Sequence, residues 1–162
     1  MKNIFGAVFC IFNTFLSFGQ DTQKGNKTNP PTTILFICEH GAARSTIAAA
    51  YFNKLAQQQG LNYRAIYRGT NPDSALAPAA QKGLKKDGFD LHGWKPLPVT
   101  KQDIENSFQV VTLDCQLPEK DNIAKPLIQW KGIPPISDDY NVARDSIVKK
   151  VQALVVELSL KK

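Results

Sequence analysis

The sequence predicts an α/β fold, a three-layer sandwich around a mostly parallel four-stranded central sheet. Short apolar runs, which are typical of buried parallel strands, occur at residues 34–37 and 110–113. Segments with apolar residues at helical spacing alternate with these runs, and this alternation favours a parallel sheet with right-handed crossovers. The length of 162 residues allows one domain with a substantial core.

The predicted elements follow one another along the chain. After the strand at 34–37, a helix over residues 46–55 places four side chains on one face: Ile47, Ala50, Tyr51 and Leu55. Residues 63–67 alternate in polarity, as a strand nearer the sheet edge does. Pro78 suits the first turn of a further helix, and Gly88 suits its end. The last helix carries an apolar stripe formed by Ile147, Val151, Leu154, Val155 and Leu158.

The beginning of the chain differs from the rest. Residues 1–19 have the pattern of a secretory signal peptide, with a basic start, an apolar stretch, and small residues (Ser17 and Gly19) before a cut at Gln20. The stretch is short for a membrane span, and an uncleaved anchor is the alternative. We therefore expect an exported protein, periplasmic or secreted, with a flexible linker over residues 20–31 and the folded domain over residues 32–162.

Charge and composition narrow the classes of partner. The net charge of +6 falls to +5 without the signal peptide, because that segment contains one lysine and no acidic residue. A mildly basic domain suits an anionic substrate. No run of lysine and arginine with interleaved aromatic residues is present, which argues against nucleic acid. The two histidines and scattered thiols show no zinc spacing, so no metal or other cofactor is expected.

The most informative motif is the loop Cys38-Glu39-His40-Gly41-Ala42-Ala43-Arg44-Ser45, between the first strand and the first helix. The N–H groups of such a loop and a helix N-terminus both favour negative charge, so they would bind a tetrahedral oxyanion and favour a thiolate. Arg44 supplies a planar guanidinium that pairs with two oxyanion oxygens. We predict that Cys38 is a nucleophile within its own anion-binding loop.

The size of the loop residues suits this role. Gly41 and the two alanines permit left-handed turns and a close approach of the backbone to an anion, and the Ser45 hydroxyl can donate to the thiolate. The predicted substrate-binding residues are Glu39, His40, Gly41, Ala42, Ala43 and Ser45. The alternative is that Cys38 is a buried structural cysteine with an arginine nearby by accident.

These residues resemble a known family. The segment from Ile34-Leu35-Phe36-Ile37-Cys38 through Arg44-Ser45 resembles the low-molecular-weight protein tyrosine phosphatase superfamily, which includes the thioredoxin-coupled arsenate reductases. The likeness continues at residues 67–72, 78–88, 109–113 and 130–158. It implies a phosphotyrosine protein phosphatase I-like fold. It also implies a Cys38 thiophosphate intermediate with a phosphorylated substrate, or reduction of arsenate with a thiol reductant such as thioredoxin.

A phosphatase also needs an acid to protonate the leaving oxygen. The family carries this acid in an Asp-Pro pair, which the corresponding region of this chain, residues 130–140, does not contain. Pro135 or its neighbour takes that place, and the candidate acids, Asp138 and Asp139, come slightly later. The alternative is that one of them caps the helix that begins near Asn141.

Cys115 is the second informative thiol, and we expect it at the same sheet edge as Cys38. In the arsenate reductase branch, resolving cysteines near this point release arsenite as a disulfide forms, so Cys115 is a candidate redox partner. The second resolving cysteine is missing, because Asp121 and Asn122 lie there, and a three-cysteine relay cannot run. The alternative is that Cys115 packs as a small hydrophobic residue.

The loop departs from the family pattern at two positions. The usual glycine and asparagine are His40 and Gly41 here. Gly41 can adopt the left-handed angle of the asparagine, but the bracing hydrogen bonds of that side chain are lost. Glu39 opposes a thiolate if its side chain points inward, whereas a protonated His40 favours one.

Three functions follow from these patterns. The first is a phosphate monoester hydrolase that resembles a protein tyrosine phosphatase, and the second is a thiol-based arsenate reductase that uses Cys38 and Cys115. The third, motivated by the missing Asp-Pro pair, is a non-catalytic module that binds phosphate or arsenate.

Overall fold

The computed structural model describes residues 29–117 and 125–161. These residues form one sheet of four strands: β1 (Thr32–Cys38), β2 (Tyr63–Gly69), β3 (Gln109–Leu113) and β4 (Leu127–Trp130). The strands are ordered β2-β1-β3-β4, and each neighbouring pair is parallel. The predicted signal peptide, residues 1–19, and most of the predicted linker, residues 20–31, lie outside the described residues.

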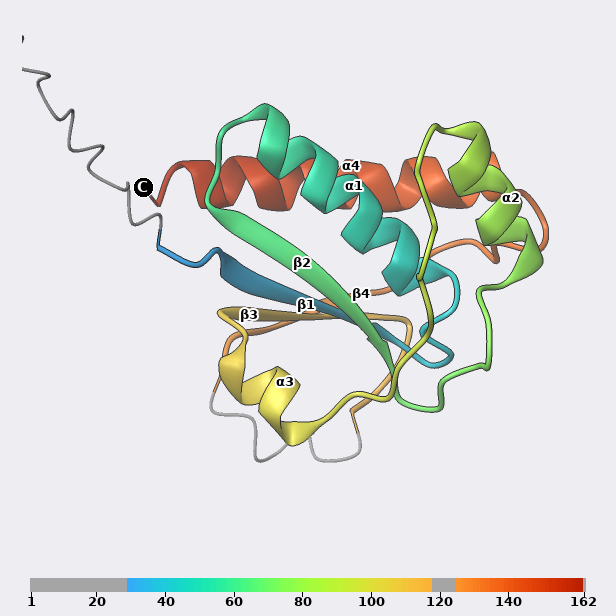
Figure 1. Cartoon of the computed structure of the whole chain (residues 1–162), viewed down its shortest axis with the longest axis horizontal. Coiled ribbons are helices and arrows are strands. Elements are labelled where there is room, and N and C mark those ends of the chain that lie inside the picture. The colour runs from blue at the N-terminus through green and yellow to red at the C-terminus, as the bar shows by residue number, and fades with distance from the viewer. Residues whose placement is uncertain (1–28, 118–124, 162) are drawn as a thin grey trace, which may run out of the picture.

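Helices cover both faces of this sheet. Figure 1 shows α1 (Arg44–Gln58), α2 (Pro78–Lys86) and α4 (Tyr140–Ser159) on one side, with α3 (Lys101–Asn106) on the other. The predicted three-layer α/β sandwich is confirmed, and its sheet is entirely parallel. We refer to the side of α1 and α4 as the upper face, and to the side of α3 as the lower face.

The alternation of side chains along β1 divides the core between the two faces. Ile34, Phe36 and Cys38 belong to the upper core, whereas Leu35 and Ile37 belong to the lower one. The Phe36 ring centre lies 5.9 Å from that of Phe52 in α1 and 5.5 Å from that of Trp130 in β4. These contacts fix α1, and therefore the loop before it, over the middle of the sheet.

The outer edge of β2 is covered by a side chain rather than by another strand. The Asn53 amide of α1 donates to the Ala65 carbonyl and accepts from the Ala65 N–H, at 3.1 and 2.7 Å. Further along, Gly69 donates to Leu97 O and accepts from Val99 N. The outward-facing backbone groups of Ala65 and Gly69 in this edge strand are thereby occupied.

The sequence patterns did not locate two of the elements. Four strands were expected, but the fourth, β4, has only four residues and no recognisable apolar run, and α3 is a single short helix. A capping box defines α3, in which Thr100 and Asp103 exchange hydrogen bonds. In the described part of the chain no helix is long and apolar enough to cross a membrane, and no three His, Cys, Asp or Glu side chains are grouped to hold a metal ion.

An ion pair ties α3 to the lower face of β2. Arg68 Nε and Nη2 each donate to one carboxylate oxygen of Asp103 at 3.0 Å. Burial opposes ionisation of Asp103, but hydrogen bonds from Arg68 and Thr100 outweigh it and hold the carboxyl pKa below 3.8. The stabilisation is present above that ordinary pKa and is lost as the pH falls through the lowered folded-state value.

Replacing this carboxylate therefore has a pH-dependent cost. At pH 7 we expect Asp103→Asn to lower the free energy of unfolding by about 1.5–3 kcal/mol, the range for hydrogen bonds to charged groups. The difference from the wild type should narrow as the pH falls below 3.8, because the carboxyl then takes up a proton first in the unfolded state and, at still lower pH, in the folded state. Urea unfolding at a series of pH values measures this, and a difference that stays constant down to pH 2 contradicts it.

Candidate active site

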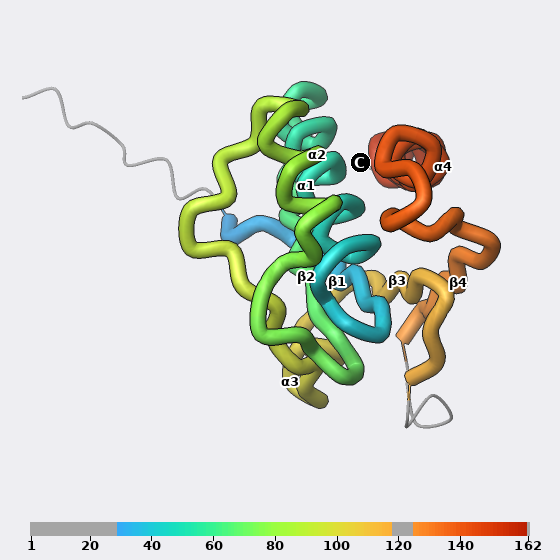
Figure 2. The backbone as a smooth tube through the Cα atoms, turned by 90° about the vertical axis from the view of Figure 1, so that its right-hand side faces the viewer, coloured from blue at the N-terminus to red at the C-terminus, as the bar shows by residue number. Residues whose placement is uncertain are grey.

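The cysteine loop, residues 38–45, lies at the carboxyl ends of the parallel strands. Cys38 is the last residue of β1 and Arg44 is the first of α1. Figure 2 looks onto this end of the sheet, where the loop joins β1 to α1 in front of the strand ends. Ligands of open α/β sheets bind at this edge, so the topology places the loop where a substrate site is expected.

Every carbonyl group from Cys38 to Ala43 accepts a hydrogen bond from a donor that lies outside the loop. Four bonds come from backbone N–H groups of a bracing segment, residues 70–77, and two come from the first helical turn. The donors to residues 38, 39, 40, 41, 42 and 43, in that order, are Thr70 N, Asn71 N, Asp73 N, Thr46 Oγ1, Ala77 N and Ile47 N. The longest of the six distances is 3.1 Å.

This arrangement determines where the loop amides point. In a trans peptide the carbonyl and the following N–H point in opposite directions, so six outward carbonyls turn the N–H groups of residues 39–44 inward. Those N–H groups have no acceptor among the described residues. Helix α1 also begins without a side-chain cap at Ala43 and without an acidic residue in its first turn. The free amides and the helix N-terminus together have the geometry and the charge that favour a bound anion.

Two glycines allow the loop to lie against β2. Gly41 has a φ of +61°, the left-handed angle predicted for it, and a Cβ at Gly41 would lie 2.8 Å from Gly69 N. A Cβ at Gly69 would lie 2.8 Å from Gly41 N and 2.9 Å from the His40 carbonyl carbon. Backbone therefore meets backbone at this point, and neither glycine can be replaced without displacing the other segment.

Ser45 lies directly beneath the Cys38 thiol. The distance between Cys38 Sγ and Ser45 Oγ is 3.1 Å, and both residues are buried. The Ser45 hydroxyl can also donate to Arg68 O at 3.4 Å. When Cys38 is a thiolate it only accepts, so Ser45 is then its donor. Burial of Cys38 among upper-face core residues holds the sulfur at the base of the loop.

The polar side chains of the loop lie at its rim. Glu39 and His40 are exposed, and His40 Nε2 lies 3.8 Å from the Glu39 carboxylate. His40 Nδ1 also lies 3.2 Å from Asp73 Oδ1 of the bracing segment. Only the backbone of Glu39 and His40 is therefore turned inward, whereas half-buried Arg44 begins α1 next to the free amides.

The two candidate acids occupy different environments. Asp139 is the N-cap of α4, where its carboxylate accepts from Asn141 N and Val142 N at 2.8 and 3.2 Å. Asp138 is exposed, and its carboxylate accepts one hydrogen bond, from Ser137 Oγ at 3.1 Å. The helix-capping alternative thus describes Asp139, and Asp138 keeps a carboxylate available for proton transfer.

The start of the acid-bearing segment, residues 131–139, is anchored by Asp114, a residue that the sequence patterns did not indicate. The Asp114 carboxylate accepts from Gly132 N and Ile133 N, at 2.8 and 2.9 Å. Asp114 itself follows β3 in a left-handed conformation, with a φ of 48°. Figure 1 shows this segment, between β4 and α4, at the same end of the molecule as the cysteine loop.

Cys115 lies beside β1 but on the other face of the sheet. Its thiol donates to Ile37 O at 3.4 Å, and it packs against the lower core cluster, whereas Cys38 belongs to the upper one. Burial first, and then the nearby charge of Cys38, raise the pKa of the Cys115 thiol from 9.0 to about 11. Cys115 is therefore protonated at neutral pH.

The close contact between the loop and β2 generates a prediction about anion binding. Gly69→Ala should displace the loop backbone and weaken the binding of inorganic phosphate by at least about tenfold, since misplaced donors lose their geometry. Gly93→Ala controls for general destabilisation, because the φ of +74° at Gly93 strains an alanine while the open space around it leaves the cysteine loop untouched. Isothermal titration calorimetry measures both, and equal phosphate affinities would contradict the role given to Gly69.

Comparisons with known proteins agree with this fold. A Halobacterium salinarum protein named "Putative arsenate reductase" is 23% identical over 125 residues, which cover 76% of this chain and 87% of that protein. A thioredoxin-dependent arsenate reductase structure from Corynebacterium glutamicum superposes with a TM-score of 0.65 and 24% identity, over 83% of this chain and 65% of that one. The YwlE arginine phosphatase structure from Geobacillus stearothermophilus superposes with a TM-score of 0.67 and 21% identity, over 81% of this chain and 95% of that one.

The family model decides the classification. The model described as low molecular weight phosphotyrosine protein phosphatase matches residues 33–126, more than half of the chain, and includes the whole cysteine loop. The chain therefore belongs to the low molecular weight phosphotyrosine protein phosphatase family.

Proposed function

We propose that this protein is a cysteine-dependent phosphate monoester hydrolase that acts through a thiophosphate intermediate on Cys38. The observation that carries the proposal is the orientation of the loop peptides, since six bonded outward carbonyls leave the next six amides for an oxyanion. The three equatorial oxygens of the transferred phosphoryl group need donors of this kind in the transition state. Arg44, which follows these residues directly, adds a bidentate cationic donor.

The reaction has two steps. In the first, the Cys38 thiolate attacks phosphorus, the bond from phosphorus to the ester oxygen breaks, and Asp138 gives its proton to that oxygen. In the second, water attacks phosphorus, Asp138 takes a proton from the water, and the sulfur–phosphorus bond breaks to release phosphate. Ser45, at 3.1 Å from the sulfur, donates to the thiolate that leaves in this second step.

Asp138 is our choice of acid because the carboxylate of its neighbour, Asp139, is already hydrogen-bonded to the start of α4. Both carboxylate contacts of Asp139 serve the first turn of α4, whereas Asp138 is exposed on the segment that reaches the active-site end of the molecule. A carboxylic acid at this position needs freedom to approach the ester oxygen, and a capping carboxylate lacks that freedom.

Reduction of arsenate is the second candidate, because Cys115 contacts the residue before Cys38 and two of the similar proteins carry arsenate reductase names. Thioredoxin or a similar thiol reductant would then be the partner. Two observations weigh against it: the thiols lie on opposite faces of the sheet, and the Cys115 pKa of about 11 keeps the nucleophilic thiolate scarce. We also propose export to the periplasm or the medium, on the leader pattern alone.

Substitution of the nucleophile and the acid tests the hydrolase directly. Cys38→Ser should abolish release of nitrophenolate from p-nitrophenyl phosphate under reducing conditions. Asp138→Asn should lower kcat/KM for phenyl phosphate by about 10²–10⁴-fold, the usual contribution of a general acid. Asp139→Asn is the matched control and should stay within about threefold, because asparagine caps a helix as well as aspartate does.

Each alternative has its own signature in this assay. A larger loss in Asp139→Asn than in Asp138→Asn would transfer the acid role to Asp139. Phosphate binding without turnover by the wild-type protein would favour a non-catalytic binding module.

The thiol chemistry can be tested separately with iodoacetamide. Because the Cys115 thiol has a pKa of about 11, we expect its alkylation at pH 7 to be slow and to rise steadily up to about pH 11. Mass spectrometry of the Cys115 peptide after timed exposure measures the rate. Fast alkylation of Cys115 at pH 7, together with arsenite release that Cys115→Ser abolishes, would establish the reductase instead.

A further inference from the structure

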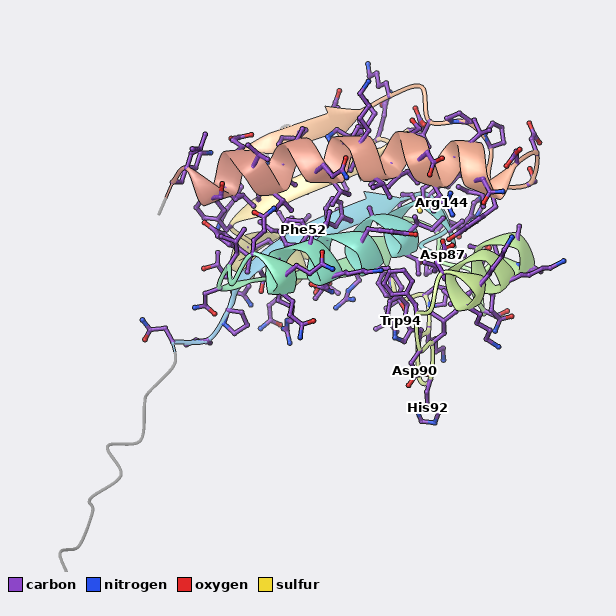
Figure 3. The ribbon with its side chains drawn as sticks, turned by 90° about the horizontal axis from the view of Figure 1, so that it is seen from above. Phe52, Asp87, Asp90, His92, Trp94 and Arg144 are labelled. Atoms are coloured by element: carbon purple, nitrogen blue, oxygen red, sulfur yellow. The ribbon has the colours of Figure 1, made fainter. Side chains whose placement is uncertain are left out.

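Outside the cysteine loop, four ionisable side chains converge where three helices meet. Tyr51 and Tyr140 each donate a hydroxyl hydrogen bond to Asp87 Oδ2, at 2.8 and 2.5 Å. Arg144 Nη1 donates to Asp87 Oδ1 at 3.0 Å. Figure 3 shows Asp87 and Arg144 pointing towards each other between the helices. We call these four residues the Asp87 cluster.

At neutral pH the Asp87 carboxyl is ionised and the two tyrosine hydroxyls keep their protons. The Asp87 side chain is only 14% exposed. Burial opposes its ionisation, but hydrogen bonds from Tyr140, Tyr51 and Arg144 outweigh it and hold the carboxyl pKa below 3.8. Burial and the bond to Asp87 raise the pKa of Tyr51 to about 12, and the pKa of Tyr140 rises for the same reasons. Removing the carboxylate leaves three donors without their acceptor.

One arm of the cluster leads to the cysteine loop. Tyr51 lies seven residues after Arg44 in α1, which places both side chains on the same face, two turns and about 10.5 Å apart. A helix of this length is rigid over two turns. Asp87 is therefore bonded to the same rigid element that carries the oxyanion-binding arginine.

The other arm leads to the acid-bearing segment. Tyr140 comes directly after Asp138 and Asp139, and Arg144 lies one turn further along α4. The Tyr140 ring packs so tightly against α2 that a Cβ at Gly83 would lie 2.3 Å from its carbons. Asp114 fixes the opposite end of the segment through Gly132 and Ile133. Between these two anchors Asp138 is exposed.

We propose that Asp87 is a positioning residue for proton transfer: it holds the first turn of α4 against α1 and thereby sets where Asp138 stands relative to the cysteine loop. The inference rests on the proposed function, because it requires Asp138 to be the proton donor. Loss of the Asp87 charge should let the start of α4 shift, and a displacement near 1 Å at a reacting group costs up to about 10²-fold in rate.

Asp87→Asn tests this without changing the shape of the side chain. The readout is kcat/KM for two substrates, which reports the steps up to phosphoryl transfer to Cys38. Phenyl phosphate has a poor leaving group, with a pKa of about 10 like that of tyrosine, and needs the acid. 2,4-Dinitrophenyl phosphate releases a stable anion and therefore does not need the acid. We expect a loss of about 10- to 100-fold with phenyl phosphate and no more than about twofold with the dinitrophenyl ester.

Asp103→Asn is the matched control. The Asp103 side chain is also 14% exposed, and its partner Arg68 is 21% exposed, against 20% for Arg144. It lies on the lower face, away from the acid-bearing segment. This variant should lose stability to a similar extent, while the ratio of the two kcat/KM values stays at the wild-type value. A changed ratio in Asp87→Asn alone therefore separates positioning from general destabilisation.

Further variants distinguish a failure of the positioning role of Asp87 from a failure of the proposed phosphatase function. In an Asp138→Asn background, Asp87→Asn should leave the ratio unchanged, because the acid is already absent. If Asp138→Asn changes the ratio and Asp87→Asn does not, the positioning role is overturned and the phosphatase stands. If the wild-type protein hydrolyses neither ester, the proposed function fails.

Hydrogen exchange then decides the positioning role without an activity measurement. Faster exchange of amides 132–142 in Asp87→Asn than in Asp103→Asn supports the positioning of this segment, and equal exchange overturns it.

Discussion

The orientation of the six peptide groups between Cys38 and Arg44 is the constraint on which the rest of the site depends. A loop with its N–H groups turned inward is unfavourable by itself, because parallel amide dipoles at close range repel and their hydrogen atoms lack acceptors. The chain supports this arrangement from outside, with a hydrogen-bond donor for each of the six carbonyls. The bracing segment, the Gly41–Gly69 contact and the uncapped start of α1 are all parts of that support.

Two similar ion pairs stabilise the periphery on opposite faces of the sheet. Asp87 with Arg144 lies above, and Asp103 with Arg68 lies below, and in each case hydrogen bonds outweigh the cost of burying the carboxylate. Buried ion pairs contribute little net stability compared with apolar packing, but each fixes the geometry of the elements that it joins. The lower pair joins one short helix to one strand, whereas the upper cluster joins three helices around the active-site end.

Local patterns predicted the fold well because the strands and helices concerned carry their own signals. The buried runs of β1 and β3, the Pro78 start of α2 and the apolar stripe of α4 all lie within a few residues of their expected places. Strand β4 was missed because its four residues are defined by pairing with β3, and no internal periodicity marks so short a segment. Likewise, the cysteine loop was evident, because its residues are contiguous.

The residues that support the site could not be predicted, because their roles depend on contacts between distant parts of the chain. No sequence pattern assigns these roles to Asp114, Asp87 or residues 70–77, and each acts through a partner far away in the sequence. The choice between Asp138 and Asp139 shows the same limit. Both have the chemistry of an acid, and only the geometry of the first turn of α4 assigns the cap to Asp139.

The amide of Asn53 has a consequence for how the molecule behaves among its own copies. An outermost strand with free ladder positions is a template on which another chain can extend the sheet, and this is a route to aggregation. In β2, the Asn53 side chain imitates a neighbouring strand for Ala65, using one donor and one acceptor from a single helix residue. At Ala65 the β2 edge is thus closed from within, by a side chain that cannot itself propagate the pairing.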